Sequence, residues 1–201
     1  MVAQTRATIL YVARKYELKL RAERQQETRR RIVEAAIELH QTLGPARTTL
    51  SDVARRAGVQ RHTLYRHFPD ERTLLLACSS RYTSENPMPN PDPWLAIADP
   101  GERLRRGLTE LYRFFEQNEP MLTSVLRDAE VHELTREAVA GRRGQEQRRI
   151  REALEKGVRG RRPLAVIRLA LAFPTWRALT RDAGLSNPQA VETLVRAFTA
   201  A

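Results

Sequence analysis

Apolar residues recur at helical spacing along most of this chain, and they predict a series of amphipathic helices. One helix is expected from about Glu27 to Leu43, with an apolar face made of Ile32, Val33, Ala36, Ile37, Leu39 and Leu43. Gly44 and Pro45 end it, since glycine favours the position after a helix and proline cannot continue one. The same period returns over residues 102–117, 120–129, 133–157, 164–183 and 188–200. No convincing run alternates apolar and polar residues, so the predicted fold class is all-α.

Two much shorter helices are expected after the first one. Thr49 is a good N-cap residue, and Asp52 three positions later resembles a capping box, so a short helix begins here and ends near Gly58. A second short helix runs to Phe68. Asp70 then caps a fourth helix that extends to about residue 82.

The two short helices carry the side chains that a helix-turn-helix requires. Ala54 is small where the second helix crosses closest, Gly58 stands where the turn favours a positive φ, and Leu64 anchors the second helix. The residues expected to pack between the helices are Val53, Ala57, Val59, Leu64 and Phe68. The sequence therefore predicts an N-terminal three-helix helix-turn-helix domain, in which the motif runs from about Thr49 to Phe68. A larger helical domain is expected to follow it.

A proline-rich stretch separates these two parts of the chain. Residues 83–101 contain five prolines, and we expect no helix to persist through that density because proline lacks an N–H and clashes with the preceding turn. The expected organisation is a basic arm over 1–25, the helix-turn-helix domain over 26–82, a linker over 83–101 and a larger helical domain over 102–201.

Positive charge is concentrated in the first third of the chain. The formal net charge is +11, and residues 1–75 hold 15 Lys and Arg against 8 Asp and Glu. This distribution is typical of a protein that binds a polyanion, although a solvated arginine-rich surface would look similar. Within residues 1–25, apolar residues at helical spacing lie between basic ones, which predicts an extra amphipathic helix on DNA or beside the next helix. A frayed tail, or translated upstream sequence, is the alternative.

The short helices also carry a family resemblance. The stretch from Thr49 to Val59 (TLSDVARRAGV) and the stretch from Thr63 to Phe68 (TLYRHF) resemble the TetR family of transcriptional regulators. The strong resemblance covers about residues 28–76, and the remainder matches only in architecture. The family implies a homodimer that binds a roughly palindromic operator in double-stranded DNA, most often a repressor released by a small-molecule ligand.

The resemblance implies a DNA-binding role for particular residues. The helix from Arg61 to Phe68 corresponds to the recognition helix in the major groove. The residues expected to contact base edges are Arg61, His62, Thr63 and Arg66, and Thr63 is an alternative contact for phosphate. The residues expected to hold the phosphate backbone are Thr49, Ser51, Tyr65 and His67.

Glu71 departs from the family pattern. The family usually has a lysine at this position, at the start of the helix after the recognition helix. A carboxylate suits a helix N-terminus but repels phosphate. We expect Arg72 to take over the phosphate contact, or the basic arm to replace it.

The second domain offers candidates for a ligand pocket and for a dimer interface. The expected pocket residues are Tyr112, Phe115, Met121, Val125, Asp128, Phe173 and Trp176, which combine an apolar wall with a polar group. In the family the last two helices pair with their copies in the dimer. The interface candidates are therefore Leu169, Leu179, Val191, Leu194, Val195 and Phe198. Pro174 is expected to kink the longer of these two helices.

Other classes of protein find little support in the sequence. Cys78 is the only cysteine, so an intrachain disulfide cannot form, and we expect a buried packing residue. No cofactor or metal is predicted, because metal-binding pairs of histidines, a nucleophile elbow and a phosphate loop are all missing, which argues against an enzyme. Neither a membrane-spanning stretch nor a signal peptide is evident, so a cytoplasmic protein is expected. A ligand-independent architectural DNA binder and a transcriptional activator remain alternatives.

Overall fold

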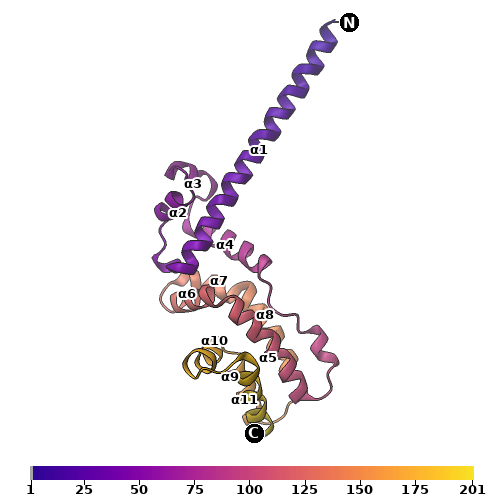
Figure 1. The fold of residues 1–201 in the computed structure, drawn as a ribbon. Helices are drawn as coiled ribbons and strands as arrows, with labels where there is room; N and C mark the ends of the chain where they lie inside the picture. Colours follow the sequence, from indigo (N-terminus) through magenta and orange to yellow (C-terminus); the bar gives the residue numbers. More distant parts are fainter. Residues whose placement is uncertain (1) are drawn as a thin grey trace.

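The computed structural model describes the backbone of residues 2–201 and the side chains of residues 16–141 and 143–201. Over these residues the chain is helical without a β-strand, which confirms the predicted all-α class. The helices form two bodies stacked along one long axis, and the N-terminal part of α1 projects beyond them (Figure 1). The elements in chain order are α1 (Val2–Thr42), η1 (Pro45–Arg47), α2 (Leu50–Arg56), α3 (Arg61–His67), α4 (Glu71–Glu85), η2 (Asp92–Ala96), α5 (Pro100–Gln117), α6 (Glu119–Ala129), α7 (Glu133–Ala138), η3 (Val139–Arg143), α8 (Gly144–Glu155), α9 (Arg161–Ala170), α10 (Phe173–Arg177), η4 (Ala178–Asp182) and α11 (Asn187–Thr199).

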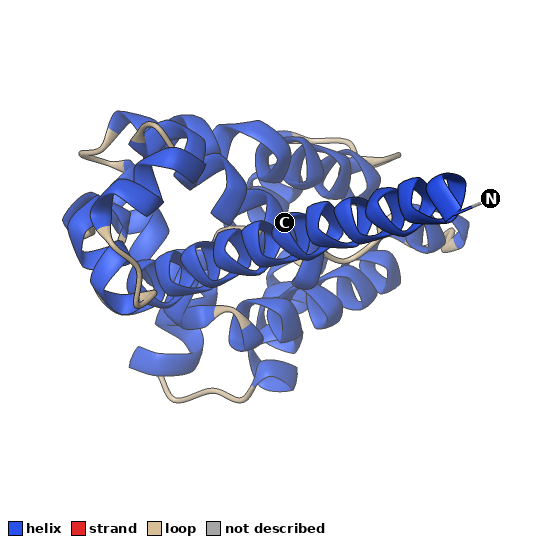
Figure 2. Cartoon of the chain, turned by 90° about the horizontal axis from the view of Figure 1, so that it is seen from above, coloured by secondary structure: helices blue, strands red, loops and turns tan. Residues whose placement is uncertain are grey.

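The first helix is much longer than predicted. α1 is continuous over 41 residues, so the expected boundary between an arm over 1–25 and a helix beginning at Glu27 does not exist in the backbone. The physical reason is visible in the sequence, because no glycine or proline occurs between Val2 and Thr42 to interrupt the helix. Seen from above, α1 runs across the rest of the molecule as one rod (Figure 2).

The N-terminal body has a small core built between α1, α2, α3 and α4. Its fully buried side chains include Ile32 and Ala36 from α1, Val53 from α2 and Leu64 from α3. Phe68 closes this core from the residue after α3. The predicted packing residues of the two short helices thus lie in one cluster, with Val59 at its margin.

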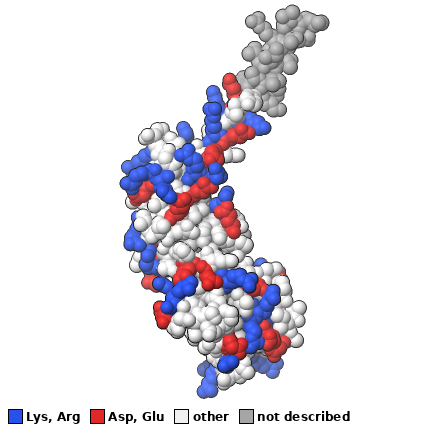
Figure 3. Space-filling model, in the orientation of Figure 1, with Lys and Arg blue, Asp and Glu red and all other residues white. Residues whose placement is uncertain are grey.

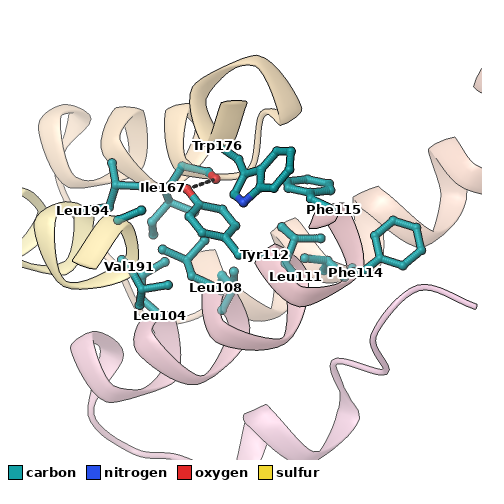
Figure 4. Packing of buried hydrophobic residues seen from close by; sticks show 14 of the residues in the cluster. Leu104, Leu108, Leu111, Tyr112, Phe114, Phe115, Ile167, Trp176, Val191 and Leu194 are labelled. Carbon is teal, nitrogen blue, oxygen red and sulfur yellow. Dashed lines mark hydrogen bonds between the residues drawn. The ribbon is translucent and has the colours of Figure 1, made fainter. Parts of the chain in front are cut away.

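The second body is organised around α5. Buried residues of α5, including Leu104, Leu108 and Tyr112, pack against α9, α10 and α11 (Figure 4). The Tyr112 hydroxyl donates a hydrogen bond to the Ala170 carbonyl oxygen at 3.0 Å, and this bond satisfies the phenol inside an apolar core. Phe115, Phe173 and Trp176 add a cluster of aromatic rings 5.4–5.9 Å apart.

The proline-rich segment is more ordered than a free linker. α4 extends to Glu85, beyond the predicted end at residue 82, and residues 92–96 form a 3-10 turn. Trp94 of that turn is 1% exposed and belongs to the core of the second body, where its indole N–H donates to Glu110. A short 3-10 turn tolerates proline at its first positions, which the expectation of an unstructured linker did not consider.

Two predicted helices are each divided in the structure. Residues 133–157 contain a π-helical segment at η3, with non-helical backbone angles at Gly141, between α7 and α8. Residues 164–183 break at Leu171–Ala172, so that Pro174 lies in the first turn of α10 instead of kinking a longer helix. None of the described helices is both long and apolar enough to cross a membrane.

Candidate nucleic-acid interface

The turn between α2 and α3 has the geometry of a helix-turn-helix. Thr49 caps α2 with a full capping box: its hydroxyl accepts from the Asp52 N–H at 3.1 Å, and the Asp52 carboxylate accepts from the Thr49 N–H at 3.2 Å. Gly58 has φ of +64°, a left-handed conformation that glycine adopts without strain. The Val59 N–H returns to the Ala54 carbonyl at 3.0 Å, which closes the turn.

One face of α3 is free for a partner. Leu64 is fully buried against α1 and α2, whereas Arg61, His62 and Arg66 are exposed. The side chains predicted to contact bases therefore lie together on the surface, with Thr63 half-buried beside them. Lys and Arg side chains gather at the end of the molecule that carries α2 and α3 (Figure 3). This arrangement suits insertion of α3 into a groove of DNA.

Most residues predicted to contact phosphate also surround α3. Thr49 and Ser51 are exposed at the N-terminal end of α2. Tyr65 is 38% exposed, and its hydroxyl accepts a hydrogen bond from Arg61 at 3.3 Å, so the two side chains support each other. His67 differs, because its Nε2 is buried without a hydrogen-bond partner and burial lowers its pKa. A phosphate contact from His67 would have to come from Nδ1.

Arg72 does not take the place that the sequence predicted for it. Its guanidinium pairs with Glu137 of α7 at 2.5 Å, and neighbouring Glu71 lies 3.4 Å from His132. The hydrogen bond with Glu137 raises the pKa of Arg72. The start of α4 thus faces the second body, which explains why a carboxylate at position 71 is tolerated and removes Arg72 from the phosphate contacts in this structure.

The sequence prediction missed the arginines that fix the motif on α1. Arg31 donates to the Ala57 carbonyl at 2.5 Å, where the end of α2 leaves backbone oxygens without helical partners. Arg29 stacks on the Phe68 ring with its guanidinium carbon 4.2 Å from the ring centroid. Arg56 pairs with Glu38 at 2.6 Å. The run Arg29-Arg30-Arg31 is visible in the sequence, but its role depends on tertiary neighbours.

A polar contact joins the end of α1 to α6. The Arg127 guanidinium and the Ser124 hydroxyl donate to the carbonyl oxygens of Leu43 and Gln41 at 2.9 and 3.0 Å, and the Asp128 carboxylate accepts from the Ala46 N–H at 2.9 Å. Burial opposes ionisation of Asp128, but hydrogen bonds from Arg127 and Ala46 outweigh it and keep its pKa below the usual value. We call these contacts of Ser124, Arg127 and Asp128 the α1–α6 clasp.

A cavity of about 80 Å³ lies where the two bodies meet. Four of the predicted pocket residues line it, namely Phe115, Met121, Val125 and Phe173. The other three do not: Tyr112 and Trp176 are core residues with internal hydrogen bonds, and Asp128 belongs to the clasp. Walls also come from His40 and Pro45 of the N-terminal body and from Cys78 of α4, which the sequence did not associate with a pocket.

Most of the predicted dimer residues are not available on the surface. Val191, Leu194 and Val195 are at most 6% exposed and face the core of their own chain, because α11 packs against α5. Leu179 and Phe198 are half-buried against the same core. Leu169 of α9 is 57% exposed and is the member of the set that a second chain could reach. The sequence periodicity predicted the apolar face of α11 correctly. It did not show that this face packs against the core of its own chain instead of a second chain.

Comparisons with known proteins agree with this geometry. Residues 32–78 match the model of the family described as bacterial regulatory proteins, tetR family. A segment is 47% identical over 55 residues to the HTH-type transcriptional regulator TtgR of Pseudomonas putida, covering 27% of this chain and 26% of that protein. Another is 32% identical over 123 residues to the HTH-type transcriptional repressor KstR of Mycobacterium tuberculosis, covering 61% of this chain and 56% of that protein.

Solved structures resemble nearly the whole chain in fold. NalD, the secondary repressor of the MexAB-OprM multidrug efflux pump in Pseudomonas aeruginosa, superposes with a TM-score of 0.61 at 23% identity over 89% of this chain and 96% of its own. A TetR family regulator from Thermus thermophilus, PfmR, gives 0.57 at 24% identity, covering 84% and 92%. Residues 32–78 therefore carry the DNA-binding domain that is typical of the TetR family. The matched segments span only about a quarter to a half of the curated relatives' length.

Proposed function

We propose that this protein is a sequence-specific DNA-binding transcriptional regulator that binds as a homodimer to a roughly palindromic operator. The observation that supports this most is the exposed face of α3, where Arg61, His62 and Arg66 stand on a helix-turn-helix whose inner face is fully packed. Arginine is suited to base readout because its fork can bond both guanine O6 and N7. In this proposal the exposed side chains of Thr49, Ser51 and Tyr65 contact the phosphate backbone.

Selection from a pool of random duplex DNA tests this role, followed by affinity measurements at fixed salt on the selected site. Arg61→Ala and Arg66→Ala are each expected to cost ~1–3 kcal/mol and to relax the preference at one base position. Arg177→Ala, an exposed arginine on α10 of the second body, is the matched control. Unchanged specificity in both α3 variants would refute the assignment, and a protein that selects no sequence would instead be an architectural binder.

We further propose that a small molecule in the cavity releases the protein from DNA. The cavity is lined by both bodies, including His40 at the end of α1 and Met121 on α6, and the α1–α6 clasp joins the same two helices. A ligand that enlarges a cavity of about 80 Å³ must therefore move α6 or α4 relative to α1. DNA affinity measured with and without a bound ligand tests this coupling.

The name of one relative supports a proposal for the sign of regulation. KstR is named as a transcriptional repressor, and we propose repression for this chain as well. In this proposal the protein acts in the cytoplasm and binds its ligand without converting it. A reporter gene placed behind the selected operator should rise on deletion of the regulator, and a fall would identify an activator.

A further inference from the structure

The cavity between the two bodies carries one formal positive charge and no balancing carboxylate among the described residues that line it. His40 is neutral at neutral pH, because burial lowers its pKa to about 4. Cys78 is an uncharged thiol, since burial raises its pKa to about 12. The remaining ionisable groups on the wall are Tyr82, whose pKa burial also raises, and Arg143. Arg143 is therefore the charge of the cavity.

Arg143 is held without a full set of hydrogen bonds. Its Nη2 is buried and has no hydrogen-bond partner among the described residues. The guanidinium carbon lies 5.7 Å from the centroid of the Tyr82 ring and 5.3 Å from that of Phe114, so two aromatic faces stabilise the charge in part. Glu146 is near enough to raise the pKa of Arg143, but burial has the larger effect and lowers it. Glu146 does not line the cavity.

The backbone around Arg143 is also unusual. Arg143 lies two residues after Gly141, whose non-helical backbone angles mark a kink between α7 and α8. A buried cation normally has a paired anion, and leaving one without is costly. The chain thus retains, next to a kink in the backbone, an arginine that lines the cavity and whose buried Nη2 has no hydrogen-bond partner among the described residues.

We propose that the cavity binds a monocarboxylate with an apolar body, and that the carboxylate accepts hydrogen bonds from the Arg143 guanidinium. This inference rests on the proposed function, in which the cavity is the effector site. The guanidinium fork matches a carboxylate in shape and charge. The apolar body lies against Phe115, Met121, Leu122 and Phe173, which form the rest of the wall. Drug-sized ligands occupy roughly 300–1,000 Å³, so the ligand is compact or the cavity widens around it.

Calorimetric titration of the full chain tests the proposal. The probes are butanoate, octanoate, dodecanoate and benzoate, each compared with the alcohol of the same carbon skeleton. The unmodified protein should bind at least one carboxylate more tightly than its alcohol. Arg143→Met, which keeps an unbranched apolar stem and removes the guanidinium, should weaken binding of that carboxylate about 10- to 100-fold and leave binding of the alcohol unaffected. Arg143→Lys should retain part of the preference.

Arg151→Met is the matched control, because Arg151 is exposed on α8 and does not line the cavity. Arg143→Met should unfold at no lower a temperature than the unmodified protein, since it removes a charge that burial disfavours and a buried Nη2 without a hydrogen-bond partner among the described residues. The proposal is overturned if no carboxylate binds, if the alcohols bind equally well, or if Arg143→Met binds carboxylates as the unmodified protein does.

DNA binding without ligand, measured in parallel, separates this proposal from the proposed function. Arg143 lies far from α3 in sequence and outside the helix-turn-helix core, so Arg143→Met should bind DNA as the unmodified protein does. If the protein binds carboxylates but selects no DNA sequence, the proposed function is refuted and the carboxylate site stands. If it binds DNA sequence-specifically but does not prefer carboxylates, the carboxylate site is refuted and the proposed function stands.

Discussion

Gly44 links the end of α1 to the clasp, and replacing it with alanine should separate the two bodies. Its backbone angles are φ +97° and ψ +154°, in a region that essentially only glycine occupies. A Cβ at this position would overlap the carboxylate of Asp128, with only 2.9 Å to Asp128 Cγ, and the guanidinium of Arg127. Gly44→Ala therefore strains the backbone and displaces the clasp at the same time.

The magnitude follows from these two effects. A residue forced into such a backbone region costs about 1–3 kcal/mol. Displacing Asp128 breaks its hydrogen bond from the Ala46 N–H, and a hydrogen bond to a charged group contributes about 1.5–3 kcal/mol. Together they predict a loss of roughly 2.5–6 kcal/mol in the free energy of unfolding. Gly184→Ala is the matched control, because Gly184 also has a positive φ of +70° but open space around it.

Urea denaturation followed by circular dichroism measures both variants. Gly184→Ala should lose only the backbone contribution, about 1–2 kcal/mol. If Gly44→Ala is no less stable than Gly184→Ala, the Asp128 contact does not stabilise the junction and the reasoning fails. If the reasoning holds, Asp128→Ala in the Gly44→Ala background should add little further loss of stability, because the two changes act on one contact.

Three further predictions concern the buried histidine, the dimer and the long helix. His40 has a folded-state pKa of about 4 against an ordinary 6.5, so the unfolded chain takes up the proton first, and stability should fall by about 3 kcal/mol as the pH drops from about 6.5 to 4. The charge of nearby Asp128 opposes this shift of the pKa, and His132 adds to it. The unfolding free energy of His40→Gln should not show this loss between pH 6.5 and about 4. If it falls with pH as steeply as in the unmodified protein, His40 is not the cause. Leu169→Glu should give folded monomers by light scattering, whereas Leu194→Glu should unfold the second body, and a folded Leu194→Glu dimer would contradict the buried position of Leu194. Deleting residues 1–25 should flatten the dependence of log DNA affinity on log salt if the projecting part of α1 meets phosphates, and an unchanged slope would show that it does not.

Local signals in the sequence were sufficient for the helix-turn-helix. The capping pair Thr49 and Asp52, the positive φ of Gly58 and the inward Leu64 all act within a few residues, and the structure places them as expected. The interruption of the last helices was harder to locate. Pro174 was recognised as a disturbance, but whether a proline kinks a helix or begins a new one depends on the backbone before it.

The partners of individual side chains depend on contacts between residues far apart in the sequence, and these could not be predicted. Arg72 was expected to meet DNA and instead pairs with Glu137, 65 residues away. Val191, Leu194 and Val195 have the spacing of an interface, yet the same spacing serves a helix that packs on α5 within one chain. The buried Nη2 of Arg143 depends on its neighbours as well, since nothing in the string of residues 139–143 distinguishes this arginine from the others of the chain.

The uninterrupted length of α1 has a mechanical consequence. At 1.5 Å per residue its 41 residues form a rod of roughly 60 Å. One end is fixed to α6 near Thr42, and Arg31, which holds the turn of the motif, lies 11 residues up the rod, or roughly 16 Å away. A stiff rod tilted by about 10° at its fixed end would carry that point sideways by roughly 3 Å. A major groove is about 12 Å wide, so in the proposed dimer a displacement of that size at each α3 would shift both helices relative to their half-sites by about a quarter of a groove width.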